Sequence, residues 1–388
     1  MLKVQTFNKI ANAGLSQFPQ ELYEVSTEIQ QPDAILLRSH SLHDAEIPCS
    51  VKAIGRAGAG VNNIPVAEMT RLGIPVFNTP GANANAVSEL VIAGMMMVSR
   101  NLCAAWDYVR HLEGNDAAIE KSIEAHKKQF SGRELQGKTL GIVGLGSVGV
   151  RVANAAVHLG MRVIGYDPTI SVNRAWELSA NVIQAHHVKE LLEVADFVSL
   201  HVPLMDATRN MMNADNLNHM QPGAVLLNFA RDGIVDNQAL HHQLENKKLK
   251  AYVCDFPSAL LKDNPAVISL PHLGASTVEA EENCAVMLVN QVRNYLEYGA
   301  IACSVNFPTV DVPQNHEGVR VAVVNNNIPN MVAQISSVFA EKGLNILSLV
   351  NKSRDAIAYT LLDVQGDVGD DALQALLKIE GVLQARQL

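Results

Sequence analysis

The sequence predicts an α/β protein with two doubly wound domains and a smaller C-terminal βαββαβ domain. Short apolar runs alternate with helical stretches up to about residue 272, which is typical of βα units around parallel sheets. One long helical pattern interrupts these runs and a second follows them. The tail from Val319 then has the order strand, helix, strand, strand, helix, strand. A chain of 388 residues also exceeds the usual size of one core, so several domains are expected.

Composition and charge indicate a globular protein with a small-molecule partner. Hydrophobic residues make up 48% of the chain and the formal net charge is -9, so we expect no broad basic surface for nucleic acid or anionic membrane. The five cysteines lie far apart without a CxxC pair, which predicts reduced thiols and no metal site. The N-terminus lacks the apolar core of a signal peptide and no apolar run reaches membrane-spanning length, so we expect a cytoplasmic protein.

The first 80 residues or so predict the first α/β domain, through the apolar runs AILLRS, VKAIGRAG and IPVFNTP. A helical pattern then extends from about Asn85 to His111 and predicts one long helix. The loop AIGRAGAGVNN places Gly58 and Gly60 after a strand, but Asn63 occupies the position of a third glycine and no acid ends the next strand. This loop is either substrate-facing or structural.

Residues 137–272 predict a second α/β sheet that begins with a dinucleotide-binding motif. In TLGIVGLGSVG, Gly144 allows a tight turn, Gly146 lets backbone N–H groups approach a pyrophosphate, and Gly149 permits close packing of helix on strand. The N-terminus of the following helix favours the negative phosphates. The next strand ends at Asp167, whose carboxylate would accept hydrogen bonds from the adenosine ribose and repel a 2′-phosphate. The predicted cofactor is therefore NAD rather than NADP.

Further polar residues follow the other strands of this sheet, at the edge where ligands of open parallel sheets bind. They are His201 and Pro203 in SLHVP, Arg231 in NFARDG, Asp255 in VCDFP and His272 in SLPH. A guanidinium can hold a carboxylate through two parallel hydrogen bonds, and a histidine can exchange a proton near neutral pH. Arg231 and His272 beside a nicotinamide therefore predict oxidation of a 2-hydroxy acid, in which hydride leaves C2 and His272 takes the hydroxyl proton.

The C-terminal part of the chain predicts a long helix, a linker and a separate domain. The segment STVEAEENCAVMLVNQVRNYLEYG has helical periodicity. Residues 309–317 lie in an irregular stretch with Pro and Asn that is typical of a linker. The βαββαβ order that follows is that of a ferredoxin-like domain, which we place at residues 318–388.

With these motifs in place, the chain resembles the D-isomer-specific 2-hydroxyacid dehydrogenases over nearly its whole length. The matching segments are GIVGLGSVG with Asp167, SLHVPL with Thr208, NFARDGIVD, PHLGAST and GIPVFNTPGANANAVSELVI. The resemblance implies two Rossmann-like domains, with a discontinuous substrate domain (1–92 and 275–308), an NAD-binding domain (93–274) and catalysis in the cleft between them. It also implies a homodimer or homotetramer, and the tail looks like an ACT domain, a regulatory amino-acid-binding module.

The resemblance also implies roles for individual residues. Arg231 matches the arginine that binds the substrate carboxylate, and His272 matches the catalytic acid/base. In the first domain Arg38, Ser39 and Asn83 match substrate contacts, and Arg38 either helps to hold a phosphate or forms a surface ion pair. The implied cofactor contacts are Gly144, Gly146, Ser147, Val148, Gly149, Asp167, His201, Pro203, Thr208, Ala230, Asp255 and Gly274. His201 either flanks the adenine pocket or has a structural role.

The sequence departs from the family pattern in the segment VCDFPSALL. Family members usually have a glutamate that holds the catalytic histidine in position, and Ala259 occupies that place here. Asp255, the nearest carboxylate, either contacts the nicotinamide amide or stands in for the glutamate. We favour the nicotinamide contact, because an offset of four residues is a long reach.

The tail departs from the ACT pattern as well. Asn330 follows Pro329 where the ligand loop usually has a glycine, and Asn325 replaces a usual histidine. Asn327 and Asn345 match positions that contact serine in regulated relatives. The tail is therefore either an effector site with these two contacts or mainly an assembly module.

These features together imply NAD-dependent oxidation of 3-phospho-D-glycerate to 3-phosphohydroxypyruvate, the first step of L-serine biosynthesis, because the tail is a feature of family members with this substrate. One alternative is a dehydrogenase for another D-2-hydroxy acid, such as lactate, glyoxylate or 2-hydroxyglutarate. A second alternative is an NAD-sensing binding protein without turnover. The absent glutamate favours the binding protein, whereas Arg231 and His272 favour an enzyme.

Overall fold

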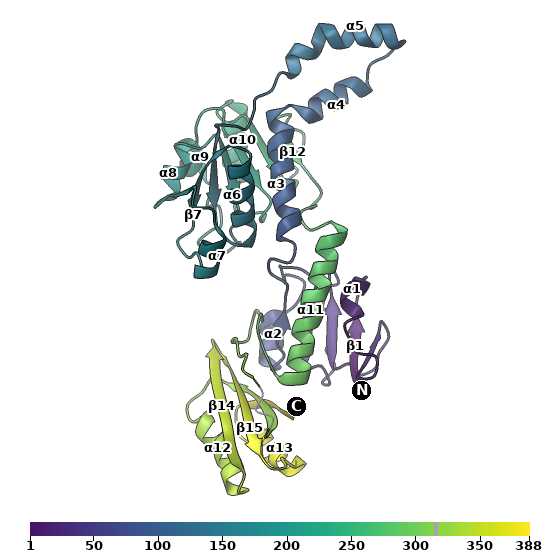
Figure 1. The fold of residues 1–388 in the computed structure, drawn as a ribbon, viewed down its shortest axis with the longest axis vertical. Coiled ribbons are helices and arrows are strands. Elements are labelled where there is room, and N and C mark those ends of the chain that lie inside the picture. The colour runs from purple at the N-terminus through teal and green to yellow at the C-terminus, as the bar shows by residue number, and fades with distance from the viewer. Residues whose placement is uncertain (314–316) are drawn as a thin grey trace. The chain divides into compact units, whose positions relative to one another are not determined.

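The computed structural model describes residues 1–313 and 317–388, and the chain forms two compact units (Figure 1). Unit 1 consists of Met1–Asn83 and Val278–Leu388, and unit 2 consists of Ala84–Thr277. Unit 1 is thus discontinuous in sequence. The predicted linker at 309–317 includes residues 314–316, which lie outside the described residues. Within the rest of this segment, Val310 pairs with Ile301 in an isolated antiparallel bridge.

The N-terminal part of unit 1 is a five-stranded parallel sheet in the order β2-β1-β3-β4-β5. Its strands are β1 (Leu2–Thr6), β2 (Tyr23–Ser26), β3 (Ala34–Leu37), β4 (Ala53–Arg56) and β5 (Val76–Phe77). Residues of β3 alternate between two cores: Leu36 packs in the cluster with α11 (Val278–Tyr298), and Leu37 packs in the cluster with α2 (Val66–Arg71). The sheet is therefore apolar on both faces, as the continuous apolar run of β3 predicts.

The C-terminal part of unit 1 is a four-stranded antiparallel sheet in the order β14-β15-β13-β16. Its elements are β13 (Val319–Asn326), α12 (Met331–Glu341), β14 (Asn345–Arg354), β15 (Ile357–Gln365), α13 (Asp370–Leu377) and β16 (Val382–Gln387), which is the predicted βαββαβ order. Val321 and Val323 of β13 face the core beneath α12 and α13, whereas Ala322 and Val324 join the core that contains α11. Both faces of this sheet are therefore covered, one by α12 and α13 and the other by the core that contains α11.

A buried ion pair fastens the antiparallel sheet to the end of α11. Arg320 and Asp363 are 1% and 2% exposed, and the guanidinium bonds the carboxylate twice, at 2.7 Å and 2.9 Å. The remaining guanidinium donors reach the carbonyl oxygens of Tyr298, Val312 and Pro313. Since all sides of the pair are hydrogen-bonded, removal of either partner would leave a buried charge, at about 3 to 5 kcal/mol.

Unit 2 is built on a seven-stranded parallel sheet in the order β12-β11-β10-β9-β6-β7-β8. Its strands are β6 (Thr139–Val143), β7 (Arg162–Tyr166), β8 (Val182–Gln184), β9 (Phe197–Leu200), β10 (Val225–Asn228), β11 (Ala251–Cys254) and β12 (Val267–Ser269). The connecting helices are α6 (Ser147–His158), α7 (Val172–Glu177), α8 (Val188–Leu192), α9 (Ala214–His219) and α10 (Asn237–Glu245). The strand order reverses between β6 and β9, and in such sheets a ligand site lies at the carboxyl ends of the strands near this point.

The predicted single helix from residue 85 to residue 111 is wrong. The chain forms α3 (Ala84–Ser99) and α4 (Leu102–Arg110), which are bent by 66°. Asn101 between them has a left-handed φ of 51°, and its side-chain amide donates to the carbonyl oxygens of Phe130 and Ser131. Asparagine tolerates this conformation, and apolar periodicity does not reveal it.

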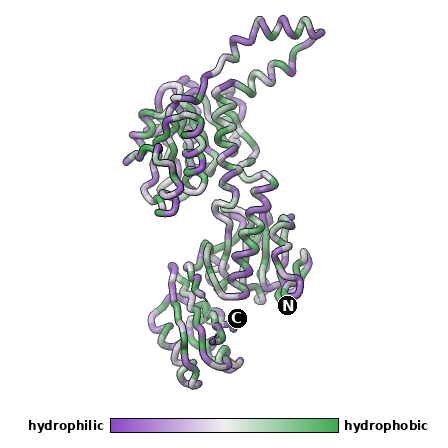
Figure 2. The backbone as a smooth tube through the Cα atoms, viewed as in Figure 1, coloured by the Kyte–Doolittle hydropathy of each residue, from purple (hydrophilic) through white to green (hydrophobic). Residues whose placement is uncertain are grey.

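After α4 the chain continues into α5 (Asp116–His126) and the 3-10 helix η1 (Lys127–Phe130). Helices α4 and α5 contain no buried residue. Figure 1 shows them extending away from the sheet of unit 2, and Figure 2 shows hydrophilic residues along much of their length. We call residues 102–130 the arm.

Among the described residues, no single helix has the length and hydropathy needed to cross a membrane. The bent pair α3 and α4 meets the criterion on length and composition alone.

Candidate cofactor and catalytic site

The loop after β6 has the geometry of a phosphate-binding glycine turn. Gly144 has a φ of +95°, and a Cβ on Gly149 would lie 2.0 Å from the Gly144 carbonyl oxygen. Gly146 is different: it is exposed, and apart from its chain neighbours no atom lies within 4 Å of where its Cβ would be. It caps α6 without a side-chain hydrogen bond, so the first-turn N–H groups of Ser147 and Val148 face an open space. These features fit the pyrophosphate of a dinucleotide.

Asp167, at the end of β7, is attached to this loop. Its Oδ2 accepts a hydrogen bond from the backbone N–H of Leu145 at 2.8 Å, and its Oδ1 accepts from the N–H of Thr169 at 2.8 Å. Oδ1 also accepts from the hydroxyl of Thr169 at 3.2 Å, whereas Oδ2 can accept a second bond and so retains capacity for a ribose hydroxyl. The predicted acid therefore lies beside the predicted glycine loop.

The structure brings Arg231, Asp255 and His272 together at one edge of unit 2. They follow the adjacent parallel strands β10, β11 and β12. Burial raises the pKa of the Asp255 carboxyl, while the hydrogen bond from Gly274 and the charges of His272 and Arg231 oppose that shift. The charges of His272 and Arg231 thus both act on the Asp255 carboxyl.

Asp255 is a buried carboxylate, and only one of its two oxygens accepts a hydrogen bond from the described residues. The residue is 1% exposed, and its Oδ2 accepts from the backbone N–H of Gly274 at 3.1 Å. Within residues 1–313 and 317–388, its Oδ1 has no hydrogen-bond partner. A buried acceptor without a donor costs about 1 to 3 kcal/mol, so a group with an N–H, such as a carboxamide, fits this position.

His272 is held by its backbone and by an aromatic ring. Its φ is +53°, its N–H donates to the carbonyl oxygen of Asp255 at 3.1 Å, and its ring packs against Phe256 with 5.0 Å between centroids. The imidazole is exposed to solvent, as is Ala259 at the position of the family glutamate. No carboxylate of the described chain forms a hydrogen bond or ion pair with this imidazole.

A buried asparagine that sequence reasoning missed supports the Arg231 turn. Asn228 is 1% exposed; its side-chain amide donates to the carbonyl oxygen of Arg231 at 2.9 Å and accepts from the N–H of Ala230 at 3.2 Å. It also approaches the hydroxyl of the buried Tyr252 at 3.4 Å. The sequence feature that could have indicated this role is a polar residue, Asn228, at the end of the otherwise apolar segment AVLLN.

The loop after β9 is tied together by the residues predicted to contact the cofactor. Thr208 Oγ1 donates to the carbonyl oxygen of Pro203 at 2.6 Å and accepts from the N–H of Met205 at 2.8 Å. His201 Nε2 forms a hydrogen bond with Ser199 Oγ at 2.9 Å, and burial lowers the pKa of His201 to about 4. His201 is therefore a neutral imidazole at neutral pH, and both side chains have structural partners of their own.

The predicted substrate contacts Arg38, Ser39 and Asn83 lie in unit 1. Arg38 follows β3 and forms an ion pair with Glu281 of α11 at 2.6 Å, so the predicted surface pair is present. The backbone N–H of Ser39 donates to the side chain of Asn8 at 3.1 Å. Asn83 is the last residue of unit 1 before α3 begins, and it is partly exposed.

The loop AIGRAGAGVNN is held by its own side chains. Arg56, at the end of β4, donates from Nε to the carbonyl oxygen of Arg38 at 2.9 Å and from a terminal nitrogen to that of Gly60. Asn63 donates to the carbonyl oxygen of His40 at 2.6 Å. These contacts support the structural interpretation of the loop. They also place a second guanidinium, Arg56, beside Arg38, which sequence reasoning did not single out.

The predicted effector contacts in the tail are exposed. Asn327 donates to the carbonyl oxygen of Asp355 at 3.0 Å, and Asn345 approaches the side chain of Gln365 at 3.5 Å. Asn330 has a φ of +69°, the conformation that glycine usually supplies, and it begins α12. Asn325 is fully buried, and its Oδ1 lacks a partner in the part of the chain that the structure describes.

Comparisons with known proteins agree with this geometry. The family model for the D-isomer specific 2-hydroxyacid dehydrogenase, NAD binding domain, matches residues 92–274. The chain is 33% identical over 351 residues to the D-3-phosphoglycerate dehydrogenase of Escherichia coli strain K12, covering 87% of this chain and 81% of that protein. It is 32% identical over 380 residues to that of Haemophilus influenzae, covering 94% and 88%. The NAD+-bound 3-phosphoglycerate dehydrogenase structure of Entamoeba histolytica aligns with a TM-score of 0.61 and 27% identity, over 79% of this chain and 98% of that one.

Proposed function

Because this chain belongs to the D-isomer-specific 2-hydroxyacid dehydrogenase family, we propose that it oxidises 3-phospho-D-glycerate to 3-phosphohydroxypyruvate with NAD, the first step of L-serine biosynthesis. The observation that carries this proposal is the meeting of Arg231, Asp255 and His272 at the edge of the sheet that also bears the glycine loop. The relatives named D-3-phosphoglycerate dehydrogenase support the choice of substrate.

Arg231 and His272 have different roles toward the substrate: Arg231 binds it and His272 exchanges a proton with it. NAD, when bound, supplies the nicotinamide that accepts hydride from C2 of the hydroxy acid. Arg231 presents an exposed guanidinium, which binds the substrate carboxylate through paired hydrogen bonds and so orients C2. His272 takes the proton of the C2 hydroxyl during oxidation and returns it in the reverse direction.

Asp255 and Asp167 hold the two ends of the cofactor. The partnerless buried Oδ1 of Asp255 accepts a hydrogen bond from the nicotinamide carboxamide, which relieves the cost of leaving that oxygen unpaired. Asp167, fastened to the glycine loop through Leu145, accepts from the ribose hydroxyls. The loops that carry Pro203, Thr208, Ala230 and Gly274 line the rest of the cofactor path as the family pattern implies.

Phe256 and the Asp255 backbone position His272 in place of the absent glutamate. The left-handed backbone of His272 is fixed by its hydrogen bond to the Asp255 carbonyl, and the Phe256 ring limits the directions of the imidazole. Packing of this kind orients a histidine without adding a negative charge to it.

Substrate recognition in unit 1 falls to Arg38, Ser39 and Asn83. Arg38 has one terminal nitrogen on Glu281, and its remaining donors suit a phosphate, which binds guanidinium in the same planar geometry as a carboxylate. The 3-phospho group would therefore compete with Glu281 for this side chain. The hydrogen bonds that the phosphate gains from Arg38 distinguish 3-phosphoglycerate from unphosphorylated hydroxy acids.

The initial rate of NADH formation with 3-phosphoglycerate, D-lactate and D-2-hydroxyglutarate tests this function. We expect kcat/KM for 3-phosphoglycerate to exceed the other two values by at least about 100-fold, because only the phosphorylated acid gains hydrogen bonds from the remaining donors of Arg38. Equal or higher values for an unphosphorylated acid would instead identify a dehydrogenase for that acid. NAD binding without turnover on all three would identify an NAD-sensing binding protein.

We also propose that residues 318–388 are an ACT regulatory domain, following the substrate domain (1–92 and 275–308), the NAD-binding domain (93–274) and a linker (309–317). The βαββαβ order and the left-handed Asn330 at the start of α12 support this assignment. Asn327 and Asn345 are then the contacts of an amino-acid effector. Activity titrated with L-serine tests it: inhibition is expected, and an unchanged rate at concentrations on the order of 1 mM would show that the tail serves assembly alone.

The arm supports a homodimer or homotetramer. Trp106, Val109 and Leu102 of α4 are 62%, 52% and 48% exposed, which is unusual for a monomer surface when such residues share one short helix. A second copy of this chain would cover them. Light scattering should show an oligomer that Trp106→Ser with Val109→Ser weakens, and a monomeric wild type would contradict it. All five cysteines are free thiols, which supports a cytoplasmic enzyme.

A further inference from the structure

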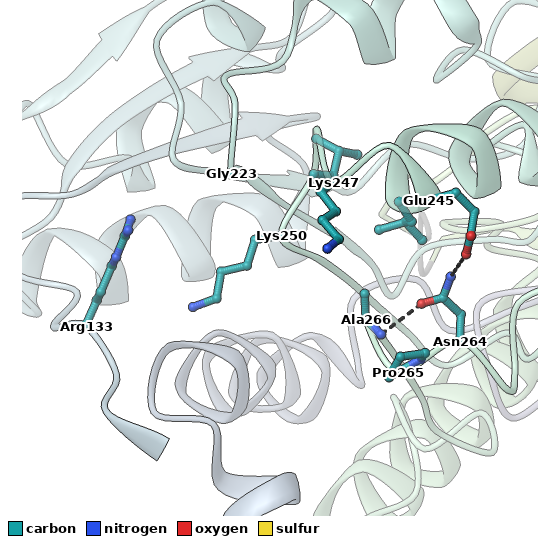
Figure 3. A pocket seen from close by; sticks show the side chains of 10 residues that line it. Arg133, Gly223, Glu245, Lys247, Lys250, Asn264, Pro265 and Ala266 are labelled. Atoms are coloured by element: carbon teal, nitrogen blue, oxygen red, sulfur yellow. Dashed lines mark hydrogen bonds between the residues drawn. The ribbon is translucent and has the colours of Figure 1, made fainter. Parts of the chain in front are cut away.

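Unit 2 contains a hollow (Figure 3) at the edge of its sheet opposite to the edge that bears the glycine loop. Its volume is about 480 Å³, within the range of small-molecule sites. Lys250 immediately precedes β11, Ala266 immediately precedes β12, and Gly223 lies just before β10. The hollow therefore lies at the amino ends of these three parallel strands.

This position separates the hollow from the proposed catalytic edge. Arg231, Asp255 and His272 follow the carboxyl ends of the same strands. Asp255 lies five residues after Lys250, across strand β11 (Ala251–Cys254), and at about 3.3 Å per residue this places roughly 16 Å between the two residues. A ligand in the hollow would not touch the residues assigned to the reaction.

Three cationic side chains line the hollow, with one carboxylate. They are Arg133, Lys247 and Lys250, and Figure 3 shows Lys250 extending toward the side that holds Arg133. The carboxylate of Glu245 is occupied by the side-chain amide of Asn264 at 3.2 Å. Among all ion pairs of the described residues, none involves these three cations.

The positive charges in the hollow act on one another. Lys250 has a long hydrogen bond of 3.4 Å to the carbonyl oxygen of Val98 and no closer acceptor in the described chain. Burial and the charge of Arg133 both lower the pKa of the Lys250 ammonium. Like charges held close together in a partly enclosed space store repulsion, and an anion between them removes it.

We propose that this hollow is a binding site for a small multivalent anion of the organic phosphate class. A guanidinium and two ammonium groups, together with the carboxylate of Glu245, give the lining a net charge of +2, which matches a phosphate dianion, and arginine binds phosphate oxygens in pairs. The volume exceeds that of a bare phosphate, and the buried Leu244 and Leu249 supply an apolar wall for a carbon skeleton. The site would sense a phosphorylated metabolite without overlapping the active site.

Calorimetric titration of the full chain tests this site, with NADH at saturation so that the glycine loop is occupied. The probes are pyrophosphate, inorganic phosphate and succinate, which separate a polyphosphate, a single phosphate and a dicarboxylate. We expect pyrophosphate to bind most tightly, and we expect its Kd to rise at least 10-fold in Lys250→Met and in Arg133→Met.

The matched control is Lys248→Met. Lys248 is two residues from Lys250, but it donates to the carbonyl oxygen of Asn218 at 2.7 Å and does not line the hollow. Its Kd should match that of the wild type, and kcat without added anion should be unchanged in all three variants. Equal pyrophosphate affinity in wild type, Lys250→Met and Arg133→Met would overturn the proposal.

Two further outcomes would also overturn it. In the first, no probe binds the wild type, and light scattering shows a changed mass of the assembly for Lys250→Met and Arg133→Met but not for Lys248→Met. That result would mean that the cations bind acidic side chains of a second copy. Binding of succinate as tightly as pyrophosphate would assign the hollow to dicarboxylates instead of phosphates.

Discussion

Two loops of this molecule share a glycine-rich sequence and follow a parallel strand, yet they differ in what surrounds the glycines. The loop after β4 in unit 1 is filled by side chains: Arg56 binds the carbonyl oxygens of Arg38 and Gly60, and Asn63 binds that of His40. The loop after β6 in unit 2 packs on itself and leaves Gly146 facing open space. Only the second loop offers its backbone to a ligand.

Two additional features distinguish the phosphate-binding loop from the other glycine loop. In unit 2, α6 begins at Ser147, directly after Gly146, so the loop ends in the open N-terminus of a helix. In unit 1 the next helix, α2, begins only at Val66, after the loop has closed. The acid at the end of the next strand also reaches the unit 2 loop, through the bond from Asp167 to the Leu145 N–H.

The largest effect within this comparison is expected for Gly149→Ala. The added Cβ would lie 2.0 Å from the Gly144 carbonyl oxygen, so α6 must move away from β6. We expect the free energy of unfolding to fall by about 1 to 3 kcal/mol and the Kd for NAD to rise at least 10-fold. Urea unfolding and calorimetric titration with NAD measure the two quantities.

Gly146→Ala is the matched control. Its Cβ meets no protein atom within 4 Å, and its φ of -73° suits alanine, so stability should stay within about 0.5 kcal/mol of the wild type. NAD binding should still weaken, because the methyl group enters the space assigned to the pyrophosphate. Unchanged NAD affinity in both variants would mean that the loop does not hold the cofactor.

Asp255→Asn is expected to weaken NAD binding by about 10-fold, the loss of one well-formed hydrogen bond. The amide keeps the shape of the carboxylate but presents one acceptor instead of two. The pH profile of kcat should change less than the NAD affinity, since the His272 imidazole forms no hydrogen bond with this carboxylate and the two groups interact only through their charges. A shifted pH profile with unchanged NAD affinity would show that Asp255 replaces the family glutamate.

His201 adds a pH-dependent contribution to the stability of unit 2, because burial of its imidazole lowers its pKa in the folded state. Its folded pKa of about 4 lies below the unfolded value near 6.5, so the unfolded chain takes up the proton first. Stability is present above pH 6.5 and is lost as pH falls toward 4. Relative to His201→Gln, the wild type should lose on the order of 1 kcal/mol across this window, after allowance for partial solvent screening.

The pH effect is measured by chemical unfolding of wild type and His201→Gln at several pH values between 4 and 7. Parallel stability curves for the two proteins would contradict a neutral, buried His201.

The smallest effect is expected in the unit 1 loop. Asn63→Ala removes the hydrogen bonds to the carbonyl oxygens of His40 and Arg38, which should lower stability by about 1 kcal/mol. NAD affinity should not change, because this loop offers no helix N-terminus. A rise in the Kd for NAD comparable to that of Gly146→Ala would remove the distinction between the two loops.

The sequence was sufficient where local patterns determine the structure. The glycine positions, the acid at Asp167 and the βαββαβ order of the tail each depend on residues close together in the chain, and the structure shows them in place. Placement at the ends of parallel strands also brought Arg231, Asp255 and His272 to one edge, because neighbouring parallel strands end side by side.

Other features depend on residues far apart in the chain and could not be predicted. A surface ion pair of Arg38 was one of two expectations, but its partner Glu281 lies more than 200 positions away and could not be identified from strand-end placement. The break at Asn101 depends on carbonyl oxygens of Phe130 and Ser131 that arrive after the arm has turned back. The partnerless oxygen of Asp255 likewise appears only once the surrounding loops are packed.

The proposed reaction depends most on His272 as the proton carrier. The decisive measurement is steady-state NADH formation from 3-phosphoglycerate by wild type and His272→Ala, with the NAD affinity of each measured in parallel. We predict that kcat falls by about 100-fold or more, as expected for loss of a general base, while the Kd for NAD stays within a few-fold. A nearly unchanged kcat in His272→Ala would contradict the account.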